Sequence, residues 1–324
     1  MTTSSPLATV APCSAPLALA ELVKSANGYA SASRADNTRR AYRADWAAFV
    51  AWCDVNALAS LPAAPEAVAL YLAHLADAGR KVATIARALA AISQAHRLAS
   101  LPSPRSTARV GDTMRGIRRR LGVAQTAKAP LLAEHVRAVV AEVPAGLLGA
   151  RDRALLVLGF AGGFRRSELV GLDVADLAFT AEGLEVTIRR SKTDQEGAGR
   201  KLGVPYSAAP ATCPVRAVRA WLDASSIAEG PAFRPVNRHG QVGAERLSDR
   251  AVALVVKRYA TAAGLDATRF AGHSLRAGLA TSAAKAGKSE RAIMAQTGHR
   301  SSAMVRRYIR DAELFSDNAA AGLL

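Results

Sequence analysis

The sequence predicts a mainly α-helical protein of two domains, with one small β-sheet in the second domain. Its 324 residues are enough for two ordinary domains. Half of them are hydrophobic but only 5% are aromatic, which favours alanine-rich helices packed through small side chains. Apolar residues recur at helical spacing along most of the chain, whereas residues 184–189 and 201–204 alternate as strands do. Residues 122–132 predict an interdomain linker.

The first region, residues 17–121, predicts a small helical domain that follows a Ser-, Thr- and Pro-rich lead-in, residues 1–16, expected to be disordered. Asp36 or Asn37 is expected to cap the second helix, and Pro65 suits the first turn of the third. Helices are predicted over residues 17–31, 37–56, 66–78, 81–99 and 106–121. The last of these carries many arginines and a single acidic residue, Asp112.

The second region, residues 133–310, predicts helices on both sides of a β-hairpin. The hairpin joins the two alternating segments through a polar loop. Ser248 or Asp249 is expected to cap one of the helices. Helices are predicted over residues 133–143, 150–161, 212–224, 248–263, 273–285, 289–297 and 301–309, with a short tail helix over residues 311–324.

The charge balance points to a polyanionic partner. Lys and Arg number 43 against 26 Asp and Glu, and both regions carry an excess of basic residues. The three cysteines have no metal-ligand spacing, and no secretory signal or membrane-spanning run is found, so we expect a cytoplasmic protein with reduced thiols. The residues predicted to contact nucleic acid are Arg87, Arg115, Arg118, Arg119 and Arg120.

Four residues near the end of the chain combine cationic and hydrogen-bonding groups with a tyrosine. They are His273 and Arg276 in HSLRAG, His299 in TGHRS and Tyr308 in VRRYIR. Guanidinium groups bind the non-bridging oxygens of a phosphodiester in fork geometry and stay charged at any working pH. A tyrosine hydroxyl can become a covalent nucleophile when that charge is neutralised and its proton has an acceptor. The set therefore indicates phosphoryl transfer to tyrosine.

These motifs resemble the second catalytic box of the tyrosine recombinases, the phage integrase family. The segment AGGFRRSEL resembles the first box, which implies Arg165 as a catalytic arginine with Glu168 as its acidic neighbour. The segment RSKT resembles the hairpin of Cre-like members, which implies that Lys192 is the general acid. His299 stands where Cre-like members carry tryptophan, whereas most of the family has histidine. The catalytic residues implied are Arg165, Lys192, His273, Arg276, His299 and Tyr308.

The resemblance implies a site-specific DNA recombinase that cuts and rejoins duplex DNA through a 3′-phosphotyrosine intermediate and a Holliday junction. The implied fold is a C-shaped clamp of a helical core-binding domain and a catalytic domain. The implied partners are double-stranded DNA with inverted half-sites and further copies of the chain, which form a tetramer on paired sites. The tail helix would dock into a neighbouring protomer. No ATP, metal or other cofactor is implied, and the sequence leaves open whether an accessory directionality factor takes part.

Several alternatives stay open at this stage. Lys201 is the second candidate for the general acid, and Tyr259 is the second candidate for the nucleophile. Type IB topoisomerases use a similar set of Arg, Lys, His and Tyr residues, although the Cre-like first domain argues against that class. A non-catalytic DNA-binding protein on a decayed recombinase frame is the other alternative, and the intact set of six residues argues against it.

Overall fold

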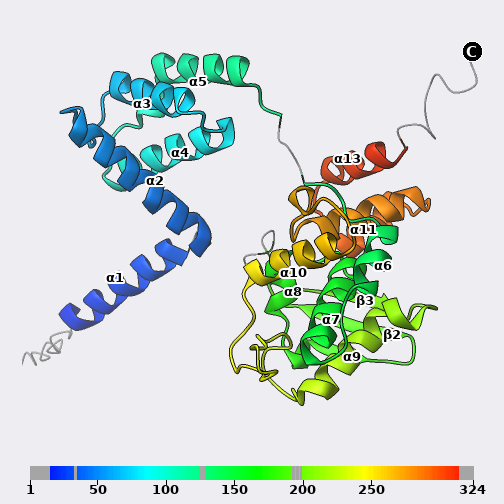
Figure 1. Ribbon diagram of the computed structural model, residues 1–324. Coiled ribbons are helices and arrows are strands. Elements are labelled where there is room, and N and C mark those ends of the chain that lie inside the picture. Colours follow the sequence, from blue (N-terminus) through cyan, green and yellow to red (C-terminus); the bar gives the residue numbers. More distant parts are fainter. Residues whose placement is uncertain are drawn as a thin grey trace, which may run out of the picture. The chain divides into compact units, whose positions relative to one another are not determined.

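The computed structural model describes residues 15–32, 35–124, 128–191, 194, 197 and 199–313 (Figure 1). The chain divides into two compact units, of which the first ends at residue 125. The described residues are mostly helical, with one three-stranded sheet in the second unit, so the predicted fold class is confirmed. None of the described helices combines the length and apolar character that a membrane span needs.

Over its described residues, the first unit has five helices and one short 3-10 turn. Four of the helices enclose a core that includes Phe49, Leu72, Ile85, Ile92 and Val110, all fully buried. The bounds are α1 Ala15–Ala32, α2 Asp36–Val55, α3 Pro65–Asp77, α4 Val82–Leu98, the turn Pro104–Ser106 and α5 Ala108–Leu121.

The helix starts in this unit show which local signals decide. Pro65 occupies the first turn of α3, as predicted, because its missing N–H has no partner there in any case. The expected cap of α2 is wrong: Ala35 holds the N-cap position without a side-chain hydrogen bond, and Asp36 is already helical. The Asp36 carboxylate accepts a hydrogen bond from Arg39 at 2.7 Å instead, so a pairing within the helix takes the place of the cap.

In its described residues, the second unit has eight helices and a small sheet, and the buried helix α7 lies among them. Leu155, Leu158, Trp221, Phe233 and Val256 lie in its core, each almost or fully buried. The helices are α6 Ala133–Ala141, α7 Leu147–Ala161, α8 Arg166–Gly171, α9 Pro214–Ser225, α10 Asp249–Ala262, α11 Ser274–Lys285, α12 Glu290–Thr297 and α13 Ser302–Glu313. Three 3-10 turns accompany them at Val174–Asp176, Pro210–Thr212 and Ala267–Arg269.

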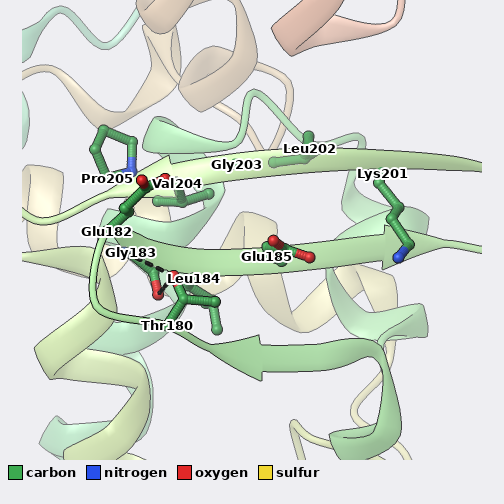
Figure 2. Close-up of a pocket in the computed structure, with 10 residues that line it drawn as sticks. All are labelled: Thr180, Glu182, Gly183, Leu184, Glu185, Lys201, Leu202, Gly203, Val204 and Pro205. Atoms are coloured by element: carbon green, nitrogen blue, oxygen red, sulfur yellow. Dashed lines mark hydrogen bonds between the residues drawn. The ribbon is translucent and has the colours of Figure 1, made fainter.

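The sheet has three antiparallel strands in the order β1-β2-β3, and these are Leu177–Phe179, Gly183–Ile188 and Arg200–Pro205. The last two confirm the predicted hairpin, while β1 was not predicted. Figure 2 shows the outer face of the sheet, where β2 and β3 line a hollow of about 470 Å³ and the exposed Lys201 and Glu185 lie on this face. The opposite face of β3 buries Leu202 and Val204.

The segment that leads into α6 belongs to the second unit from residue 128 onward. Leu131 is fully buried, and its N–H donates to the carbonyl of Ser274 at 2.9 Å. The N–H of Ala129 donates to the carbonyl of Arg269 at 2.8 Å. Gly278 faces the Leu131 carbonyl so closely that a Cβ would meet the oxygen. This end of the predicted linker is therefore packed against α11.

Candidate active site

Arg165 lies where the sequence predicts it, at the residue before helix α8. Its backbone N–H donates to the Glu168 carboxylate at 2.9 Å, and its guanidinium makes an ion pair with the same carboxylate. The Glu168 side chain is only 1% exposed, so this acidic group is held rigidly and fixes the arginine in turn. Helix α8 has only six residues, so its N-terminus contributes little dipole charge. The positive charge at this position comes from the Arg165 guanidinium.

Arg276 is the buried centre of the site. One of its amino groups, Nη1, donates to the carbonyls of Gly163, at 2.7 Å, and Thr297. The other, Nη2, has no hydrogen-bond partner among the described residues. Burial first, and then the charge of Arg165, lower the pKa of Arg276 to about 10, so the group is still cationic at neutral pH. An unpaired buried donor is costly, and an anion is the partner that would satisfy it.

His299 follows the turn that ends α12. Gly298 adopts the left-handed conformation at φ 66°, which reverses the chain and directs His299 back toward Arg276. The residue is 9% exposed, and its Nδ1 lies 2.7 Å from Thr297 Oγ1. Burial, followed by the positive charge of Arg276, lowers its pKa to about 4, so the ring is neutral at pH 7.

Tyr308 and His273 complete the group. The Tyr308 hydroxyl lies 3.3 Å from His273 Nε2, and the centres of the Tyr308 and His299 rings are 6.0 Å apart. The tyrosine ring is half-buried against a small apolar cluster that includes Ile293 and Val305. The structure therefore brings together five of the six predicted catalytic residues, from helices α8, α11 and α13 and the turns beside them. Lys192 lies outside the described residues.

Arg200, the first residue of β3, is a site residue that the sequence analysis missed. Its Nη1 donates to the carbonyls of Ala295 and Gln296, each at 3.2 Å, and its Nη2 has no partner among the described residues. Burial lowers its pKa below the usual arginine value. The signal in the sequence was strand alternation: Arg200 is in phase with Leu202 and Val204, which face the core.

The two alternative candidates fit less well. Lys201 lies on the outer face of the sheet (Figure 2). The adjacent Arg200 points to the opposite face, where it contacts the end of α12 that precedes His299. Tyr259 is 4% exposed, and its hydroxyl donates to the buried Asp152 carboxylate at 3.0 Å. Burial and this carboxylate both raise the pKa of Tyr259, which disfavours a tyrosinate there. These observations count against both alternatives, while the placement of Lys192 is not described.

The residues predicted to bind nucleic acid fall into two groups. Arg87 makes two hydrogen bonds to Asp45, at 2.7 and 3.1 Å, and Arg115 makes an ion pair with Asp112. Acidic partners are therefore present for these two residues. Arg118, Arg119 and Arg120 are all exposed in the last turn of α5, where the helix C-terminus favours cations.

Comparison with known families gives two matches. Residues 130–314 match the phage integrase family, and residues 29–100 match the phage integrase N-terminal SAM-like domain. An integrase/recombinase xerD homolog of Selenomonas ruminantium is 44% identical over 292 residues, covering 89% of this chain and 85% of that protein. The recombinase cre of Escherichia phage P1 is 29% identical over 283 residues, covering 81% and 80%.

Solved structures agree on the fold. A lambda integrase dimer bound to a COC′ core site has a TM-score of 0.59 and covers 90% of this chain and 95% of that one, at 18% identity. The XerH site-specific recombinase bound to a palindromic difH substrate has a TM-score of 0.53 and covers 80% and 71%, at 17% identity.

Proposed function

The chain belongs to the phage integrase family and is a tyrosine-type site-specific DNA recombinase, and we propose that it cuts and rejoins DNA through a 3′-phosphotyrosine intermediate at Tyr308. The observation that carries this proposal is the position of the Tyr308 hydroxyl. It lies 3.3 Å from His273 Nε2, and Tyr308 interacts electrostatically with Arg276. A nucleophile, a base and a cation thus lie in one site.

The proposed step is an in-line displacement at a DNA phosphate. His273 Nε2 accepts the proton of the Tyr308 hydroxyl, and the oxygen attacks phosphorus. The bond from phosphorus to the 5′-oxygen breaks, and Lys192 protonates that leaving oxygen. The products are a phosphotyrosine on the 3′ end and a free 5′-hydroxyl. Ligation to the 5′-hydroxyl of a partner DNA strand reverses these chemical steps, and strand exchange passes through a Holliday junction.

The arginines hold the phosphate during this step. Arg165 is oriented by Glu168, and Arg276 offers an Nη2 that has no hydrogen-bond partner in the described part of the chain, so both suit the non-bridging oxygens. His299 is the further phosphate-contacting residue of the proposal. Because arginines can supply the positive charge and the phosphotyrosine conserves bond energy, the proposed reaction needs neither a metal nor ATP.

We propose that the first unit is the core DNA-binding domain, that the two units form a clamp on duplex DNA with inverted half-sites, and that four copies assemble on paired sites. The exposed arginines at the end of α5 support the first point. The predicted tail helix begins within α13, which extends to Glu313, and residues 314–324 lie outside the described residues.

A supercoil-relaxation assay separates this proposal from a topoisomerase. We expect no relaxation of a plasmid that lacks the target site, because cleavage by a recombinase depends on specific half-sites. Exchange between two plasmids that each carry the site is the expected activity. Efficient relaxation of any plasmid, without exchange between sites, would make the chain a topoisomerase-like enzyme.

Binding to DNA should depend strongly on salt. If about eight phosphates are contacted, log K should fall with log salt at a slope near −7. Changing Arg118 and Arg119 to Glu should weaken binding to all sequences alike and reduce the slope by about 2, because phosphate contacts carry no base information.

A charge-matched control is available on α9. Arg216 and Arg219 stack over Tyr206 and Phe179, and α9 contributes none of the site residues. Changing these two arginines to Glu should leave the slope unchanged, as measured by fluorescence anisotropy at several salt concentrations. Equal effects of the two charge reversals would mean that only net charge matters and that α5 makes no phosphate contacts.

A further inference from the structure

The threonine before the Gly298–His299 turn is a partner of His299 to which no role has been assigned. Thr297 is the last residue of α12 and is fully buried. Its Oγ1 has two partners: the Ile293 carbonyl at 2.6 Å, one turn earlier in the helix, and His299 Nδ1 at 2.7 Å. Both distances are those of good hydrogen bonds.

Counting protons at this hydroxyl fixes the tautomer of the histidine. A carbonyl oxygen cannot donate, so the single hydroxyl proton of Thr297 goes to Ile293. The Thr297 oxygen must then accept from His299, which places the imidazole proton on Nδ1. Since the ring is neutral at pH 7, its other nitrogen, Nε2, carries a lone pair.

We propose that Thr297 is a positioning residue that holds His299 as the Nδ1–H tautomer, with Nε2 as a proton acceptor, before DNA binds. This inference rests on the proposed function, because it specifies how one residue of that site is prepared. His299 Nε2 can donate to a phosphate oxygen only if the ring takes up a second proton or if the Thr297 hydroxyl turns from Ile293 to Nδ1. The charged and titratable groups that act on the ring are Arg276, Arg165, His273 and Arg200.

The variant Thr297→Val tests this with little change in shape. Valine removes the hydroxyl, so the Nδ1–H tautomer would leave a buried donor unpaired. The ring should then lose both its fixed orientation and its preference for the Nδ1–H tautomer, and the loss of orientation is what should slow the reaction. We expect single-turnover DNA cleavage to slow by about 10- to 100-fold, by analogy with the loss of a group that orients a metal-bound histidine. The conservative variant Thr297→Ser keeps the hydroxyl and should restore most of the rate.

Nitrogen NMR of the ¹⁵N-histidine-labelled full chain reads the tautomer directly, with His299→Gln used to assign the signal. The wild-type protein and Thr297→Ser should show a protonated Nδ1 and an unprotonated Nε2, and Thr297→Val should not. A protonated Nε2 in the DNA-free wild-type protein would overturn the inference. This measurement does not depend on catalysis, so it can fail or succeed independently of the proposed reaction.

Two kinetic controls separate positioning from a general loss of structure. In a His299→Gln background, Thr297→Val should cause no further loss of rate if the threonine acts through the histidine. Thr281→Val makes the same chemical change at a buried threonine of α11 and should leave both the rate and the tautomer unchanged. Additive losses with His299→Gln, or an equal loss from Thr281→Val, would refute the positioning role. Absence of any covalent adduct with the wild-type protein would instead defeat the proposed function.

Discussion

Tyr308→Phe should abolish covalent attachment to DNA while leaving DNA binding nearly intact. Only the hydroxyl is nucleophilic, and removal of an enzyme nucleophile lowers the rate by a factor on the order of 10⁶. The phenyl ring keeps the packing of Tyr308 against Ile293 and Val305, and the hydroxyl contact with His273 lies at an exposed position, so the fold should lose less than about 1 kcal/mol.

The measurement is the amount of protein–DNA adduct formed on a nicked DNA duplex, from which the cleaved fragment diffuses away and traps the intermediate. Tyr259→Phe is the matched control, since it removes a tyrosine hydroxyl from the same unit at a buried position bonded to Asp152. We expect this control to form the adduct. If the Tyr308→Phe variant formed the adduct, another residue would have to be the nucleophile.

Arg165→Ala should bind DNA but cleave it about 10²- to 10³-fold more slowly, the usual effect of removing one preorganised donor to a charged transition state. Glu168 holds this guanidinium in place, so the free enzyme already has it oriented. The defect should lie in the charge on the non-bridging oxygens. Replacing the bridging 5′-oxygen with sulfur should therefore not restore the rate of this variant.

Lys192→Ala should respond in the opposite way to the same substrate. A 5′-alkoxide needs a proton as it leaves, whereas a thiolate leaves without one. Sulfur should therefore rescue Lys192→Ala and leave Arg165→Ala slow, as measured by single-turnover cleavage of the two substrates. Rescue of Lys201→Ala in place of Lys192→Ala would assign the acid to the strand, although Lys201 lies on the outer face of the sheet.

The order of the site along the chain could be predicted because the motifs are local. Arg165 stands between a glycine pair and a helix start, and His273, Arg276, His299 and Tyr308 occur in three short segments. Apolar periodicity also marks α13, which carries Tyr308. In α11, which carries Arg276, alanines and buried residues occur on most sides, so helix propensity rather than periodicity predicts that helix. The strand β1 escaped prediction because its three residues are too few to show alternation.

The supporting contacts could not be predicted, because they join segments far apart in the sequence. Arg200 reaches the carbonyls of Ala295 and Gln296 across the fold, and Arg276 joins the Gly163 and Thr297 carbonyls. The contact between Thr297 and His299 is local, but it depends on the left-handed turn at Gly298. No pattern in the sequence distinguishes this threonine from one that only packs.

Identification of the trapped DNA linkage tests the central claim most directly. The adduct formed on a nicked duplex is digested with protease and nuclease, and the peptide that carries a nucleotide is sequenced by mass spectrometry. The account predicts one modified residue, Tyr308, joined to a 3′-phosphate, with a free 5′-hydroxyl on the other DNA fragment. A nucleotide on any other residue, or a linkage through a 5′-phosphate, would contradict it.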